Sequence, residues 1–239
     1  MNEDVRKLLK VQELDKEVVR LAEEIEKMQK KVEEKEAEVR MQKDNIEALH
    51  KEIGELLEDK KFKDELLNES VENLKKLEKK AKSVTTEKQL NAINTEIEIS
   101  RTNQDILEEK LLSIMGTIEE KEKAVKEMET SLDTAQRELD ALKKATTENI
   151  NQINGDINEI EERKKILYKD IDAKIIKRYE ELNRWTKGTS VVPVRQGACY
   201  GCFMKITPQT LATVKETDEV VFCPNCGRIL YWPEEDEKK

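Results

Sequence analysis

Four cysteines near the C-terminus are the residues of this chain best placed to do chemistry. Cys199 and Cys202 form one C-x2-C pair, and Cys223 and Cys226 form a second pair further along. Zn²⁺ prefers tetrahedral thiolate ligands, and two residues between cysteines allow a tight turn that directs both sulfurs at one ion. The spacing predicts one structural Zn²⁺, because four cysteine ligands leave no position open for a substrate.

Three other uses of these thiols remain as alternatives. Iron sites of the rubredoxin type also use two C-x2-C pairs, and they would give a coloured protein. A redox-active dithiol needs only one pair, so the presence of two pairs favours a metal. Disulfides are disfavoured in the reducing cytosol where we expect this protein.

The residues after each cysteine pair set the geometry of the two turns. Gly227 follows the second pair and can adopt a positive φ, whereas Phe203 stands at the equivalent place in the first turn. We expect Phe203 to pack in the ribbon core, and Tyr200 and Trp232 to be either core or contact surface.

Short strands must hold the two turns together. Val191–Val194, Glu219–Phe222 and Arg228–Trp232 are rich in β-branched and aromatic residues and are predicted to be strands. A ribbon of about 50 residues buries too little apolar surface to fold alone, so metal binding should supply much of its folding free energy.

The remaining residues offer no catalytic arrangement. The single histidine, His50, lies within a charged helical pattern and has no ligand partner at helical spacing. No glycine-rich phosphate-binding loop occurs, and the many glutamates fit solvated helix faces. We therefore expect no enzyme activity and no small-molecule substrate.

One basic stretch, residues 163–187, precedes the ribbon and contains interleaved aromatic residues. Such a stretch could contact phosphates and stack on bases, or it could simply be a solvated helix end that complements the helix dipole. The candidate contacts to a partner or to nucleic acid, including two from the ribbon, are Lys174, Lys177, Arg178, Arg184, Trp185, Lys187, Tyr200 and Arg228.

The first 187 residues carry the repeat of a coiled coil. Apolar residues recur in alternating steps of four and three from Leu14 to Val84, and again from Leu90 to Leu142. The register breaks near residues 83–86, where Thr86 and Gln89 have capping-box spacing. We predict two antiparallel helices whose paired positions sum to about 170. Polar seam residues near the tip, such as Lys60 and Lys63, either fix the register or soften the tip.

Composition supports a mainly α protein. Of the 239 residues 41% are charged and 4% are aromatic, and proline is absent before residue 193. The predicted domains are a hairpin over residues 1–187 and a zinc ribbon with an acidic tail over residues 188–239. The formal net charge of −9 argues against binding nucleic acid by bulk charge. No stretch resembles a signal peptide or a membrane span, so we expect a cytoplasmic protein.

The ribbon resembles that of the bacterial C4-type zinc ribbon domain proteins. The resemblance rests on the run from Val191 to Cys202 and on Cys223–Tyr231, with its Cys-Gly-Arg-Ile-Leu ending. Residues 86–93 are similar to the turn segment of that family. The resemblance implies a helical hairpin followed by a zinc ribbon. It also implies a regulator that binds the nitrogen-type alternative sigma factor of RNA polymerase, in some members with RNA binding.

Overall fold

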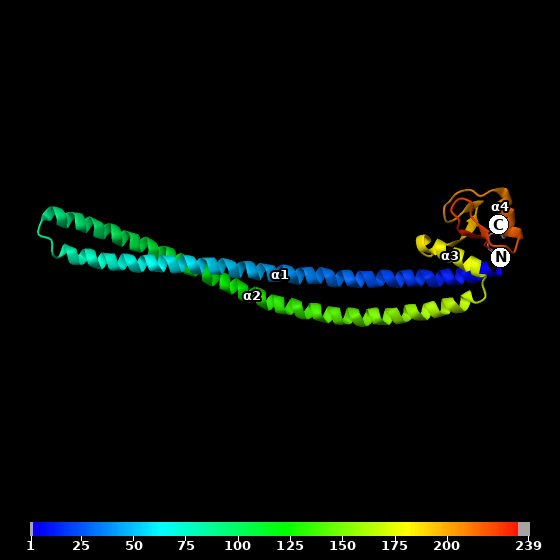
Figure 1. The fold of residues 1–239 in the computed structure, drawn as a ribbon, viewed down its shortest axis with the longest axis horizontal. Coiled ribbons are helices and arrows are strands. Elements are labelled where there is room, and N and C mark those ends of the chain that lie inside the picture. The colour runs from blue at the N-terminus through cyan, green and yellow to red at the C-terminus, as the bar shows by residue number, and fades with distance from the viewer. Residues whose placement is uncertain (1, 234–239) are drawn as a thin grey trace. The chain divides into compact units, whose positions relative to one another are not determined.

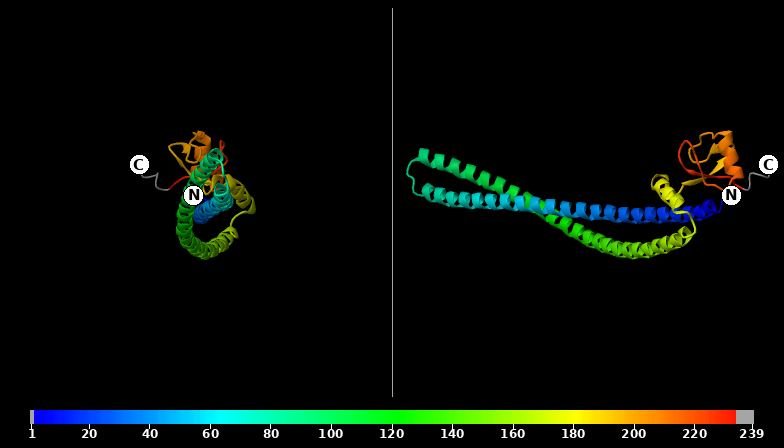
Figure 2. Two further views of the ribbon diagram at one scale, coloured as in Figure 1. Left: turned by 90° about the vertical axis from the view of Figure 1, so that its left-hand side faces the viewer. Right: turned by 45° about the vertical axis from the view of Figure 1, so that its right-hand side comes forward.

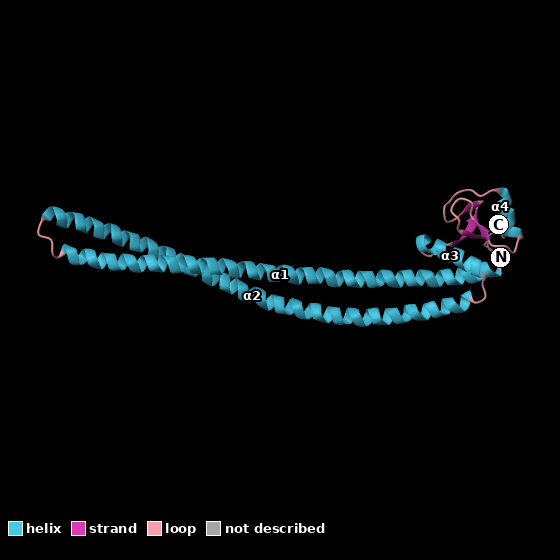
Figure 3. Ribbon diagram, in the orientation of Figure 1, coloured by secondary structure: helices cyan, strands magenta, loops and turns pink. Residues whose placement is uncertain are grey.

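The computed structural model describes residues 2–233, so the acidic tail, residues 234–239, lies outside the described residues. The fold is mainly helical, with a small sheet after the third helix (Figure 3). Contacts divide the chain into two compact units. Unit 1 comprises residues 1–32 and 142–239, and unit 2 comprises residues 33–141.

Two long helices form the hairpin. Helix α1 spans Glu3–Ala81 and helix α2 spans Glu87–Tyr168, and they run antiparallel from the connection at residues 82–86 (Figure 1). Asn2 caps α1, because its side-chain oxygen accepts a hydrogen bond from the Val5 amide at 3.1 Å. At the start of α2 the Thr86 hydroxyl donates to the Gln89 side chain at 2.6 Å. The predicted antiparallel coiled-coil hairpin is confirmed.

In unit 2 the two helices pack through the apolar seam. Ile46 and Ile53 of α1 are buried against Ile118 and Val125 of α2. Nearer the connection the seam becomes polar, and the Ser70 and Ser100 hydroxyls lie 3.5 Å apart. The positions of this serine pair sum to 170, as folding back about residue 85 predicts.

In unit 1 the same seam continues between the other ends of the helices. Leu21 is buried with Ile153 and Ile160, and Leu14 and Ile157 pack against them. Burying each such side chain contributes roughly 1.5–3 kcal/mol.

The basic stretch does not form one continuous helix. Helix α2 ends at Tyr168, a turn follows, and helix α3 runs from Ala173 to Thr186. Asp172 caps the start of α3, because its carboxylate accepts the Lys174 amide at 2.7 Å. The sequence analysis predicted no break within this stretch, which it placed in the hairpin domain. The buried side chain of Ile171 in the intervening turn explains the break, because it packs into the core of unit 1.

A four-stranded sheet follows α3. Its strands are β1 (Val191–Arg195), β2 (Ala198–Cys199), β3 (Val221–Phe222) and β4 (Ile229–Tyr231). The strand order is β2-β1-β4-β3, with β1 and β4 parallel and the other pairs antiparallel. Helix α4 (Pro208–Glu216), which the sequence analysis did not predict, begins at the Thr207 cap.

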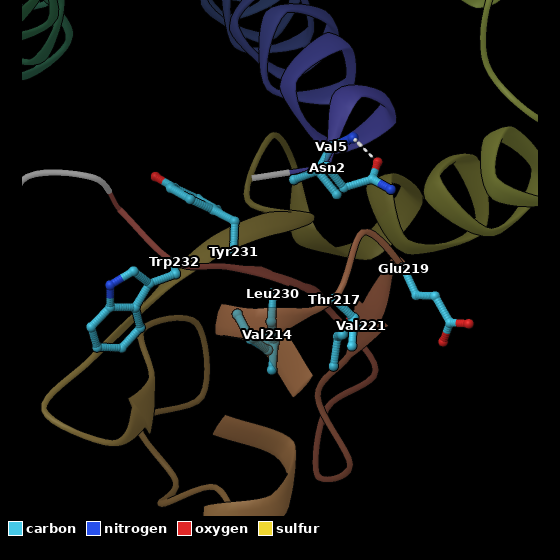
Figure 4. Close-up of a pocket in the computed structure, with 9 residues that line it drawn as sticks. All are labelled: Asn2, Val5, Val214, Thr217, Glu219, Val221, Leu230, Tyr231 and Trp232. Carbon is cyan, nitrogen blue, oxygen red and sulfur yellow. Dashed lines mark hydrogen bonds between the residues drawn. The ribbon is translucent and has the colours of Figure 1, made fainter. Parts of the chain in front are cut away.

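The sheet is attached to the N-terminal end of α1 through a shared core. Val5, Leu8 and Val11 of α1 are buried with Tyr179 of α3 and Ile229 of β4. The views in Figure 2 show α3 and the sheet beside this end of α1. In Figure 4, Asn2 and Val5 lie over the sheet and line a small pocket with Leu230, Tyr231 and Trp232, among others.

The length and apolar content of the helices bear on membrane crossing. Over residues 2–233, none of them combines the length and the apolar character that crossing a membrane requires.

Candidate metal centre and its surroundings

The two cysteine pairs form turns, here called knuckles, with matching backbone hydrogen bonds. In the first knuckle the Phe203 amide donates to the Cys199 carbonyl at 2.7 Å. In the second, the Gly227 amide donates to the Cys223 carbonyl at 2.8 Å. The Cys199 amide donates to the Met204 carbonyl, and the Cys223 amide donates to the Arg228 carbonyl. Each acceptor lies five residues after its donor. Each knuckle therefore has the same local architecture.

The four sulfurs converge at one point. All four lie within 4.8 Å of one another, and the distances Cys199 Sγ–Cys226 Sγ and Cys202 Sγ–Cys223 Sγ are both 3.8 Å. Tetrahedral zinc with bonds of about 2.3 Å requires sulfurs about 3.8 Å apart. The cysteines thus fit the ion, and the cofactor prediction, one structural Zn²⁺, is confirmed.

The metal-free thiols differ in how readily they ionise. Burial raises the pKa of the Cys199 thiol to about 12 and also raises the pKa of Cys223. Burial opposes ionisation of Cys226 too, but hydrogen bonds from the backbone and side chain of Arg228 outweigh it and lower that pKa to about 7. A divalent cation would stabilise all four thiolates, and it would release protons on binding.

Arg228 links the second knuckle to α3. Its Nε donates to the Thr189 carbonyl at 2.8 Å, and its guanidinium carbon lies 4.8 Å from the centroid of the Trp185 ring. A Cβ on Gly201 would clash with its side chain, so Arg228 also lies against the first knuckle. The structure therefore shows Arg228, a predicted partner contact, holding the ribbon against α3.

Phe203 does not pack in the ribbon core, so that expectation is wrong. Its side chain is 71% exposed and does not belong to the apolar cluster of the ribbon, because Phe203 forms the left-handed turn after Cys202, with φ of 59°. The Tyr200 ring, 52% exposed, meets it edge to face at 5.5 Å. Trp232 is half-buried beneath the Lys215 ammonium, which lies 4.0 Å from the ring centroid.

The basic candidates on α3 and its cap are all exposed. They are Lys174, Lys177, Arg178, Arg184 and Lys187. Arg178 reaches the second knuckle, since a Cβ on Gly227 would lie 3.1 Å from its Nη2, and it also pairs with Glu181 at 3.3 Å. The structure thus gathers Arg178, Trp185 and Arg228 at the second knuckle. Tyr200 belongs to the first knuckle instead.

Asp15 is a buried carboxylate that the sequence analysis missed. Its side chain is 5% exposed and accepts hydrogen bonds from Tyr179 Oη at 2.5 Å and Asn183 Nδ2 at 2.9 Å. The Lys164 ammonium lies 2.6 Å from its other oxygen. Burial lowers the pKa of Lys164, but hydrogen bonds with Asp15 and Glu161 outweigh it and raise that pKa. Asp15 therefore joins α1, α2 and α3.

Gln12 makes a second buried connection, between α1 and the ribbon. Its Nε2 donates to the Val191 carbonyl at 2.8 Å, and its Oε1 accepts the Val191 amide at 2.6 Å. These two hydrogen bonds give the N–H and C=O groups of Val191 in β1 partners from outside the sheet. Gln12 and Asp15 each directly follow an apolar seam position, Val11 and Leu14, where polar residues are usual in a coiled coil, so no sequence signal distinguishes them.

Taken together, the four-thiol site and the antiparallel helices define a zinc-ribbon protein built on a coiled-coil hairpin. Residues 11–187 match the family model for the CT398-like coiled coil hairpin domain, and residues 198–230 match that for the C4-type zinc ribbon domain. The chain belongs to the CT398-like hairpin family, which agrees with the resemblance seen in the sequence.

Solved structures with the same fold come from several bacteria. CT398 from Chlamydia trachomatis is 26% identical, with a TM-score of 0.83 over 97% of this chain and 98% of that one. HP0958 from Helicobacter pylori is 22% identical, with a TM-score of 0.69 over 97% and 98%. A Mycobacterium smegmatis protein is 25% identical, with a TM-score of 0.68 over 98% and 100%. A search of curated proteins gave no match.

Proposed function

We propose that this chain is a non-enzymatic, cytoplasmic adaptor that binds a protein partner, with Cys199, Cys202, Cys223 and Cys226 as the ligands of its structural zinc. The partner surface that we propose lies on unit 2, in the segment nearer the connection between the long helices, where large apolar side chains are exposed and several seam positions are polar. The exposed fractions of Phe62 and Ile99 are 59% and 56%.

Heptad geometry places four of the exposed apolar side chains of unit 2 on one side of the hairpin, whereas Leu57, Leu112 and Met115 directly follow seam positions and lie on the opposite side. Three polar side-chain contacts join α1 to α2 on that opposite side of the hairpin. Their residues directly follow seam positions. The contacts are Lys43–Gln136, His50–Glu129 and Glu78–Arg101. In an antiparallel coiled coil, the positions just before the seam share the other side. That side carries the exposed apolar residues Phe62, Leu66, Ile99 and Ile106.

Several seam positions of this segment are polar, whereas an isolated coiled coil carries apolar residues there. At the seam, Lys60 and Lys63 are held by Asp64 and Asp59 of the same helix. Apolar groups left in water while polar groups occupy the seam favour a surface that another protein covers. The resemblance to the C4-type zinc ribbon proteins makes the nitrogen-type alternative sigma factor the first candidate for that protein.

The test is an affinity pull-down from the native cytosol, with and without nuclease, followed by direct binding to the purified sigma factor. We expect retention of a protein at high salt and after nuclease treatment. The double variant Phe62→Ser and Ile106→Ser should reduce it at least fivefold, while Ile166→Ser, exposed on α2 in unit 1, should not. Equal retention by both variants would refute the coil surface.

Binding to RNA or DNA is the second candidate function, and the exposed cations of α3 favour it. Lys174, Lys177 and Arg184 are exposed on α3, and so is Trp185, which is 54% exposed. Filter binding should then show an affinity that falls with salt by about 0.7 log unit per log unit for each phosphate contacted on a single strand. Reversal of Lys174, Lys177 and Arg178 to glutamate should abolish it. Absence of binding at low salt would dismiss this candidate.

A further inference from the structure

The first knuckle contains a phenylalanine where the second contains a glycine. Phe203 and Gly227 donate equivalent hydrogen bonds and have φ of 59° and 72°. Glycine adopts this left-handed region freely, whereas the Cβ of other residues disfavours it. The second knuckle shows that glycine meets every requirement of the turn. The zinc site therefore does not explain the phenylalanine.

Burial does not explain it either. The Phe203 ring is 71% exposed, and Met204 beside it is 56% exposed. A left-handed backbone costs stability at a residue other than glycine, and the exposed ring adds little stability by burial. Strained residues concentrate at functional sites, and exposed aromatic side chains are the usual anchors of protein interfaces.

The surface beside Phe203 is hollowed. Phe203 and Tyr200 line a groove of about 480 Å³ between the first knuckle and the N-terminal part of α1. Its other walls include Leu9 of α1, Pro193 of β1 and Tyr231 of β4. This groove could hold one large apolar side chain of a partner next to the Phe203 ring.

The charges around the knuckle are mainly positive. The Arg195 guanidinium lies 5.4 Å from the centroid of the Tyr200 ring, and Lys205 is exposed next to Met204. No carboxylate within the described part of the chain pairs with Arg195 or Lys205. Glu13 and Lys16 of the groove pair with each other at 2.7 Å and so contribute no net charge.

We propose that the first knuckle and its groove bind a short acidic segment of a partner protein. An aromatic or leucine side chain of that segment lies beside Phe203, and its carboxylates face Arg195 and Lys205. This inference rests on the proposed adaptor function but uses a surface in unit 1, formed by other residues than those that carry that proposal. The aliphatic part of the groove lining, from Leu9, Val192 and Pro193, favours a peptide over a nucleic acid.

The test is selection of a phage-displayed random dodecapeptide library on the zinc-loaded full-length protein. We expect enriched peptides in which aspartate or glutamate flanks an aromatic residue or leucine. Phe203→Gly should weaken them at least tenfold while leaving the melting temperature unchanged or higher. Arg195→Glu should weaken them at least fivefold. The matched control is Ile166→Ala, which removes a 64% exposed apolar side chain on α2 outside both proposed surfaces and should bind as the wild type.

Three outcomes of the peptide experiments would overturn the proposal. They are a failure to enrich any peptide, enrichment of peptides without acidic residues, and equal binding by Phe203→Gly. Competition by a 20-nucleotide oligouridine at low salt would assign the surface to single-stranded RNA instead and would also overturn it. The adaptor function is judged separately by the pull-down, which can succeed through the coil surface when the peptide selection fails.

Discussion

Replacement of Asp15 by asparagine should destabilise unit 1 selectively. The carboxylate is acceptor-only and is surrounded by three donors, from Lys164, Tyr179 and Asn183. An asparagine amide would direct its own donor at one of these groups and would leave the Lys164 ammonium without its closest counter-charge. Breaking a buried ion pair costs about 3–5 kcal/mol.

The lower end of that range applies here. Lys164 keeps a second partner, Glu161, at 3.0 Å, and the Glu161 side chain is 45% exposed. We therefore expect a loss of about 3 kcal/mol. With a urea dependence of about 2–3 kcal/mol per molar, the unfolding midpoint should fall by about 1–1.5 M.

Tryptophan fluorescence is suited to this measurement. The chain has two tryptophans, Trp185 and Trp232, and both belong to unit 1 together with Asp15. The matched control is Asp133→Asn, which breaks an exposed pair with Arg137 within α2 and should cost under about 0.5 kcal/mol. A shift for Asp15→Asn no larger than that of the control would refute the assignment of Asp15 as the buried link between the helices.

Three further changes test the same region. Above about pH 10 the folded protein should lose stability, because the raised pKa values of Tyr179 and Lys164 mean that it retains protons which the unfolded chain releases. Urea midpoints at pH 9 and pH 11 would show this, and Tyr179→Phe should have a smaller dependence. Gln12→Ala should cost about 1–3 kcal/mol by leaving the buried Val191 backbone groups without partners, measured by the same fluorescence assay. Removal of zinc by a chelator should release one ion per chain and change the Trp232 emission while preserving most of the helical circular dichroism.

Each of these predictions has a clear contrary result. A urea midpoint that is constant from pH 9 to pH 11 would mean that Tyr179 is not held neutral by the fold. A Gln12→Ala protein as stable as the wild type would show that water replaces the glutamine. Retention of native fluorescence after complete loss of zinc would show that apolar packing alone holds the ribbon.

Much of the hairpin could be predicted from the sequence because a heptad pattern is local and repeats many times. The position at which the helices reverse followed from the broken register near Thr86, and the pairing of Ser70 with Ser100 followed from simple arithmetic. The thiol cluster was equally predictable, since metal spacing within each cysteine pair is a local property of a few residues. Strands β1, β3 and β4 were recognised from their β-branched and aromatic residues.

Other elements could not be predicted, because their reasons lie far away in the sequence. Helix α3 separates from α2 where Ile171 enters a core supplied by α1 and β4, which no local pattern reports. The two-residue strand β2 exists only as a partner of β1, and the short helix α4 depends on packing against the sheet. The exposure of Phe203 was predicted wrongly, because a large apolar residue in a small ribbon suggests a core position unless the backbone angle is known.

By itself the sequence determined the two features that depend on local patterns. The heptad repeat determined two antiparallel helices, and the cysteine spacing determined four thiols suited to one ion. Only the tertiary structure decided how these parts are joined. Asp15 and Gln12 are polar residues in a polar sequence, and they become structural links only when α2, α3 and β1 surround them. The free energy of a buried hydrogen bond or ion pair depends on the exclusion of water, and several distant segments must come together to exclude it.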